Sequence, residues 1–165
     1  MKMQKILSFL ALLLVVSGLA ACAAITATSE PAVSQNGIRV FDPWVRAAVM
    51  KHDMGGEMQS GGAVTGAFML VQNTNDQADM LLSAASEAAE DVQIHETTMR
   101  DGVMSMAEIY GIEIPAQGHV ELKPGGYHIM LIGLKEELKD GDTLTIKLYF
   151  QNAGEVAVEA VVRNP

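Results

Sequence analysis

The sequence predicts an all-β domain with the architecture of a sandwich or barrel. Short apolar segments, most of them four to eleven residues long, recur along the chain. Residues that favour turns separate them at 73–76, 100–102, 124–126 and 140–142. Short strands at this spacing are typical of sandwiches and barrels.

The early strands are bounded by Pro, Gly, Asn and Asp. Pro43 splits the first apolar stretch because proline cannot donate a hydrogen bond within a strand ladder. Segments 91–97 and 103–110 flank Arg100-Asp101-Gly102, which predicts a hairpin. The expected strands are, in chain order, 38–41, 44–47, 63–73, 79–85, 91–97, 103–110, 119–122, 127–132, 143–150 and 155–162.

The last two segments give the clearest strand pattern. Apolar residues occupy every second position of 143–150 and of 155–162, as expected for strands with one buried face. A helical signal is confined to one turn near 134–139. No internal repeat is apparent.

The N-terminus has the features of a targeting segment. Lys2 and Lys5 precede an apolar run over 6–16 of signal-peptide length. Leu19-Ala20-Ala21-Cys22 then has the form of a lipobox, which predicts a signal peptide over 1–21 and a lipidated Cys22. The alternative is an incidental cysteine in an ordinary cleaved signal. Residues 22–36 are rich in Ala, Ser, Thr and Pro and predict a flexible tether before a domain over 37–165.

Composition narrows the function classes. The chain carries 11 basic and 20 acidic residues, a net charge of −9. An acidic protein of this kind is poorly suited to bind nucleic acid or anionic lipid headgroups through basic patches. The only cysteine is Cys22, so lipidation would leave the domain without a thiol.

Two histidines and two methionines in the C-terminal half form a candidate metal site. His128 and Met130 share a face of one strand because they are two positions apart. The hairpin at 100–102 folds Met106 back toward His95. Two imidazoles and two thioethers without a thiolate form a donor set that suits Cu(I). Taken singly, each residue has an ordinary structural use, such as a surface histidine or a methionine in the core.

The spacing of these residues resembles the PCu(A)C family of periplasmic copper chaperones. Ten residues separate the first His from the first Met, twenty-one follow, and His-x-Met completes the pattern. The fragments VQIHETTM, DGVMSMAEI and PGGYHIMLIGL carry it, and the resemblance extends over about 41–162. It implies a cupredoxin-like Greek-key β-sandwich that binds Cu(I) outside the cytoplasm. It also implies delivery to the dinuclear copper centre of cytochrome c oxidase subunit II, with a Sco-type thiol protein as a second partner.

A segment between the second and third strands departs from the family pattern. AAVMKHDMGGEMQSGG contains Met50, His52, Met54 and Met58, where family members usually have a shorter link. One interpretation is an auxiliary copper-capturing loop, since methionines and a histidine can wrap a soft ion. The other is a surface loop that acquired methionine by drift.

Several rival functions are weighed against copper delivery. A blue-copper electron carrier needs a Cys ligand, which the domain lacks. No nucleophile and base occur in a recognisable context, so an enzyme is not expected. Copper buffering or resistance would use the same site and stays open. A non-metal sandwich lipoprotein for assembly or adhesion would not require the four-residue spacing.

Overall fold

The computed structural model describes residues 30–49 and 63–165 of the chain. Regular structure in these residues is entirely β, which confirms the predicted class. The strands are β1 (Val33–Gln35), β2 (Ile38–Arg46), β3 (Thr65–Asn73), β4 (Asp79–Ala85), β5 (Ala89–Arg100), β6 (Val103–Glu108), β7 (Ile112–Ile114), β8 (His119–Leu122), β9 (Tyr127–Leu134), β10 (Thr143–Phe150) and β11 (Gly154–Arg163). Within these two ranges, no helix is long and apolar enough to cross a membrane.

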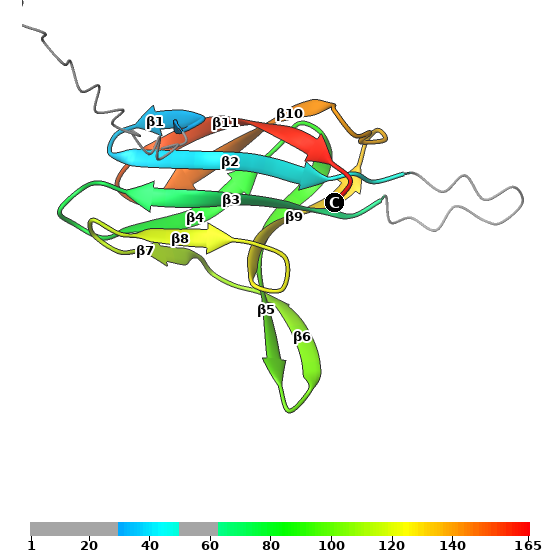
Figure 1. Cartoon of the computed structure of the whole chain (residues 1–165), viewed down its shortest axis with the longest axis horizontal. Coiled ribbons are helices and arrows are strands. Elements are labelled where there is room, and N and C mark those ends of the chain that lie inside the picture. The colour runs from blue at the N-terminus through cyan, green and yellow to red at the C-terminus, as the bar shows by residue number, and fades with distance from the viewer. Residues whose placement is uncertain (1–29, 50–62) are drawn as a thin grey trace, which may run out of the picture.

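Hydrogen bonds join the strands into one strongly curved sheet. The order is β6-β5-β9-β3-β2-β11-β10-β4-β7, with β1 added to β2 and β8 to β3. Strands β11 and β2 pair in parallel, and the other pairs are antiparallel. β4 also packs against β5, which lies far from it in this order, so the sheet closes into a sandwich (Figure 1).

Aliphatic side chains from both layers fill the interior. β10 and β11 alternate buried and exposed residues, as their sequence predicts. The largest fully buried side chains are Ile38, Val40, Val45, Val71, Leu81, Ile114, Leu122, Ile129, Leu131, Ile146, Leu148 and Val156. Burial of such aliphatic side chains is the main source of stability in a sandwich of this size.

Strand β2 runs through Pro43, where the sequence predicts two separate segments. The register with β3 shifts between Phe41 and Trp44, so the proline sits in a bulge and removes no required ladder bond. Asp42 has a φ of 45° at this point. Its carboxylate forms an ion pair with Arg163 of β11, which lowers the pKa of Asp42.

The structure differs from the predicted elements in three further places. β1 falls inside the segment predicted as a tether, so the folded domain begins earlier than residue 37. β7 was not predicted, because three residues are too few to show a pattern. The helical turn predicted at 134–139 is a bend, followed by an isolated bridge between Ala48 and Leu138.

The hairpin of β5 and β6 projects from the sandwich (Figure 1). All six residues of β6 are exposed. Asp101 and Gly102 form its turn with φ values of 52° and 80°, the backbone of a type I′ turn. The hairpin predicted around Arg100-Asp101-Gly102 is confirmed. Its extension away from the core was not apparent from the sequence.

Candidate metal centre

Strand register brings the four predicted ligands to one face of three neighbouring strands. His95 of β5 lies directly opposite His128 of β9. Met106 of β6 lies opposite Thr97, two residues beyond His95 on the same face of β5. Met130 lies two residues beyond His128. The imidazole centroids of His95 and His128 are 5.7 Å apart.

A chain of hydrogen bonds fixes the tautomer of His95. Asp91 can only accept, so its Oδ2 receives the Nε2–H of Gln93 at 2.7 Å. The Gln93 Oε1 therefore faces His95 and accepts from its Nε2–H at 2.8 Å. Neutral imidazole carries one proton, so the lone pair of His95 is on Nδ1. In the described residues, this Nδ1 is the only buried side-chain nitrogen or oxygen without a hydrogen-bond partner.

His128 is held in the opposite sense. Its Nδ1 donates to the carbonyl oxygen of Gly126 at 3.0 Å, which leaves the lone pair on Nε2. The side chain is 7% exposed. The ring of Phe68 packs on it at a centroid distance of 6.3 Å, and Trp44 packs on Phe68 at 4.5 Å. Aromatic packing and a backbone bond thus orient this ring before any ion binds.

A groove of about 270 Å³ opens beside the histidines. Its lining residues are Arg46, Val64, Thr65, Gly66, Phe68, Thr97, Met104, Met106, Pro124, Gly125, His128 and Met130. Three of the predicted ligands, Met106, His128 and Met130, therefore line the groove. His95 is not in the lining but lies next to His128, which is. Met106 is 53% exposed, which makes it the most accessible of the three. A larger hollow of about 900 Å³, near Ser86, Lys135 and Tyr149, has neither His nor Met in its lining.

Electrostatics favour the neutral form of His95. Burial lowers the pKa of His95, and the neighbouring His128 lowers it further. Glu108, directly opposite on β6, acts in the other direction. A neutral imidazole is the form that coordinates metal.

The donor set fits a soft monovalent ion better than a hard one. Within 30–49 and 63–165, no three or more His, Cys, Asp or Glu side chains gather as a metal cluster. Such clusters are what zinc or hard divalent ions usually require. Two imidazole lone pairs beside two thioethers fit Cu(I).

The predicted auxiliary metal residues, Met50, His52, Met54 and Met58, and the predicted lipidation site, Cys22, are not among the residues that the structure describes. His119 is exposed on β8 opposite Gln72 and does not line the groove. Met104 lines the groove and is 63% exposed.

Sequence reasoning missed the groups that orient the ligands. Asp91 and Gln93 precede His95 at alternate positions of β5, so their period of two was a readable signal that they share its face. The stack of Trp44 and Phe68 on His128 had no such signal, because it joins distant strands. Gly66 lies opposite Met130, and a Cβ there would be 2.9 Å from the Phe68 ring.

Solved structures of PCuAC domains share this fold, which confirms the cupredoxin-like sandwich. A structure described as "Copper-bound PCuAC domain from PmoF2" is 25% identical, with a TM-score of 0.61 over 81% of this chain and 97% of that one. The "Solution structure of CuI-DR1885 from Deinococcus Radiodurans" is 30% identical, with a TM-score of 0.50 over 74% and 76% of the two chains.

Sequence comparison gives the family. The pattern of the family described as "Putative lipoprotein LpqE-like" matches residues 38–162. A protein of Leifsonia xyli subsp. xyli, "Putative lipoprotein Lxx21020", is 34% identical over 150 residues, covering 89% of this chain and 83% of its own length. The chain therefore belongs to the LpqE-like family, with the fold of a PCuAC domain.

Proposed function

We propose that this protein is a copper chaperone that binds one Cu(I) ion as cargo. Its ligands are Nδ1 of His95, Nε2 of His128 and the thioethers of Met106 and Met130. The protein acts by binding and release, not as an enzyme.

One observation carries the proposal. The unpartnered, buried Nδ1 of His95 belongs to a ring 5.7 Å from His128, beside a groove that two further soft donors line. Leaving a buried nitrogen unpaired costs free energy unless a ligand uses it. The likeness to a copper-bound PCuAC domain supports the same metal.

The arrangement also provides a route for release. His95, His128 and Met130 sit on strands within the sandwich, whereas Met106 sits on the exposed strand of the projecting hairpin. Met106 is therefore the most accessible of the four ligands, and the bound ion is open to an incoming ligand on this side. Thioethers hold Cu(I) without charge pairing, so a thiolate acceptor can displace them.

For the acceptor, we propose the dinuclear copper centre of cytochrome c oxidase subunit II. A Sco-type thiol protein is the proposed second partner. The resemblance of the chain to PCu(A)C chaperones supports both. Transfer to such a thiol-bearing acceptor proceeds by exchange of one ligand at a time, with copper remaining Cu(I).

The sequence of the N-terminus supports a location outside the cytoplasm. We propose a signal peptide over 1–21, lipidation of Cys22 and a tether that ends before β1, which anchor the domain outside the cytoplasm. The name of the LpqE-like family supports a lipid anchor. Cys22→Ser should release the protein from the membrane or block its processing, as fractionation and intact mass would show. A mature protein that is unlipidated and begins elsewhere would contradict the anchor.

Competition with a Cu(I) chelator tests the site. His128→Ala and Met130→Ala should each weaken Cu(I) binding strongly. His119→Ala should bind Cu(I) with the same affinity as wild type, because His119 lies outside the groove. Equal effects of all three substitutions would refute the ligand assignment. Incubating the loaded protein with the apo-acceptor then separates delivery from buffering: a chaperone transfers copper, and a buffering protein retains it.

A further inference from the structure

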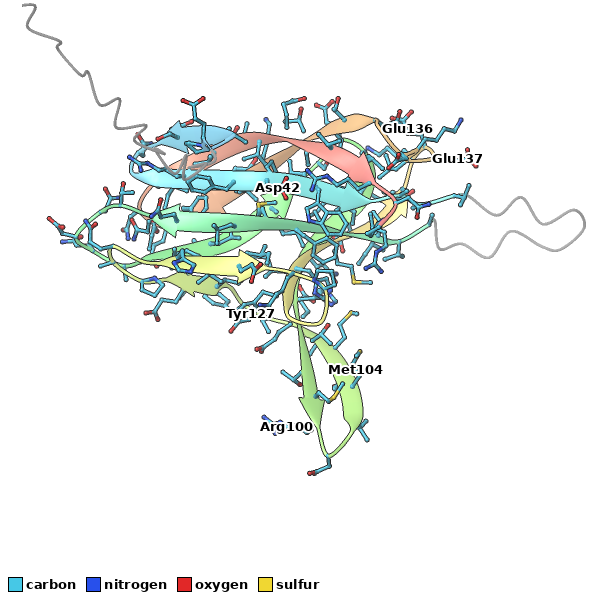
Figure 2. The ribbon with its side chains drawn as sticks, viewed as in Figure 1. Asp42, Arg100, Met104, Tyr127, Glu136 and Glu137 are labelled. Carbon is cyan, nitrogen blue, oxygen red and sulfur yellow. The ribbon has the colours of Figure 1, made fainter. Side chains whose placement is uncertain are left out.

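Two methionines outside the four proposed ligands lie exposed on the projecting hairpin. Met99 of β5 is 67% exposed and Met104 of β6 is 63% exposed. They are direct cross-strand partners. Figure 2 shows Met104 on the arm of the hairpin beyond the sandwich. At this exposure neither side chain contributes much to the core, so packing does not explain their presence.

Strand periodicity places this pair on the ligand-bearing face. Positions 95, 97 and 99 of β5 share one side, as do 104, 106 and 108 of β6. Met104 lines the same groove as Met106. A rise of about 3.4 Å per residue puts Met104 roughly 7 Å beyond Met106 along the strand.

The register also brings the two side chains close to each other. In the two-residue turn at Asp101-Gly102, Arg100 and Val103 form the closing pair. The N–H of Ile109 donates to the carbonyl of Ile94 at 2.9 Å, so hydrogen-bonded pairs fall on the even positions of β5. Met99 and Met104 are therefore a non-hydrogen-bonded pair, whose Cβ atoms approach to about 4.5–5.5 Å. Two thioethers at that separation can reach one ion.

We propose that Met99 and Met104 form a second, weak Cu(I) site at the hairpin tip. The ion passes between this pair and the four-ligand site through Met106, during both loading and release. This inference rests on the proposed function, because it gives that function a route. Two neutral thioethers bind Cu(I) more weakly than two imidazoles and two thioethers together, so the tip exchanges copper quickly and does not store it.

Methyl NMR tests the site directly. With the ε-methyl groups of methionine labelled with ¹³C, Ag(I) serves as a thioether-binding probe that is not oxidised. The first equivalent of Ag(I) should shift the methyl resonances of Met106 and Met130. Excess Ag(I) should then shift Met99 and Met104 together. Absence of a shift at these two residues would overturn the proposal even if the first equivalent binds tightly.

Transfer kinetics test the route. The double variant Met99→Leu, Met104→Leu keeps the apolar surface and the volume but removes both sulfurs. It should retain the affinity of wild type for one Cu(I) and slow transfer to a chelator by about tenfold, equivalent to ~1.4 kcal/mol in the barrier. Transfer at the wild-type rate would contradict the proposal.

A matched variant controls for position. Thr98 and Ser105 are the neighbouring cross-strand pair and face the other side of the hairpin. Adding Thr98→Met and Ser105→Met to the double leucine variant restores two methionines on the wrong face, and it should not rescue transfer. Rescue would show that location on the ligand face is irrelevant. If the wild-type protein does not bind a first equivalent of Cu(I) tightly, the proposed function itself is refuted.

Discussion

His95 and His128 face each other across the ladder of β5 and β9, and opposite ring nitrogens anchor them. His95 donates from Nε2 to Gln93, and His128 donates from Nδ1 to the carbonyl of Gly126. One Nδ1 lone pair and one Nε2 lone pair are left for a metal. Hydrogen bonds to the outer nitrogen fix ligand orientation in many metal sites.

Removing the Gln93 amide should weaken copper binding without touching a ligand. Gln93→Ala leaves the Nε2–H of His95 without its acceptor, so the ring can adopt the tautomer that protonates Nδ1. We expect affinity for Cu(I) to fall by about 10–100-fold, the usual cost of losing such a partner. Chelator competition measures the affinity, and ¹⁵N chemical shifts report the tautomer. Gln151→Ala, at an exposed turn, is the control. Unchanged affinity in Gln93→Ala would show that the hydrogen-bond chain does not position His95.

Adding a methyl group at Gly66 should displace the Phe68 ring and thereby disturb the orientation of the His128 ring. A Cβ there meets the Phe68 ring at 2.9 Å, and that ring packs on His128. Gly66→Ala should therefore destabilise the domain by about 1–3 kcal/mol and weaken Cu(I) binding. Denaturant unfolding and chelator titration measure the two effects. Gly126→Ala is the control, since its added Cβ has ordinary contacts at 3.6 Å. Wild-type behaviour of Gly66→Ala would mean that Phe68 has room to move.

The His95 ring should titrate below the ordinary imidazole value of 6.5 in the metal-free protein. Burial and His128 lower its pKa, whereas Glu108 raises it. Glu108→Gln should consequently lower the midpoint further, as imidazole NMR would show, and Glu113→Gln on β7 should not. A midpoint at or above 6.5 in wild type would contradict the burial of this ring.

The same shift makes stability depend on pH. Between the lowered pKa of folded His95 and 6.5, the unfolded chain binds more protons than the folded one. The contribution of His95 to stability is therefore present above 6.5 and lost as the pH falls to the folded pKa. Denaturant midpoints of the metal-free protein should decline across this window, and less so for His95→Ala.

The segment containing Met50, His52, Met54 and Met58 should assist capture without building the main site. Arg46 and Val64, near its two ends, line the groove. Closing a loop around an ion costs conformational entropy, whereas ligands on strands lose that entropy when the domain folds. Replacing all four residues should preserve the tight first equivalent and remove a weaker one, or slow loading. Loss of the tight equivalent would place the segment in the main site, and no change at all would favour drift.

The parts of the fold and site that follow strand periodicity were readable from the sequence. The period of two correctly puts His128 and Met130 on one face, and the Asp101-Gly102 turn correctly returns Met106 toward β5. Interactions between distant strands were not readable. Packing of Phe68 on His128 depends on contacts between strands that are far apart in the sequence. β1 was missed for another reason, since Asn36-Gly37, which joins it to β2, is a local hairpin signal. The pairing of Met99 with Met104 follows from the register of β5 and β6, which the structure supplies.

X-ray absorption on the protein loaded with one equivalent of Cu(I) tests the central claim most directly. The proposed site predicts mixed coordination, with two nitrogen neighbours from His95 and His128 and two sulfur neighbours from Met106 and Met130. The sulfur contribution should diminish in Met130→Ala. A spectrum with only nitrogen or oxygen neighbours around copper would contradict the proposed site.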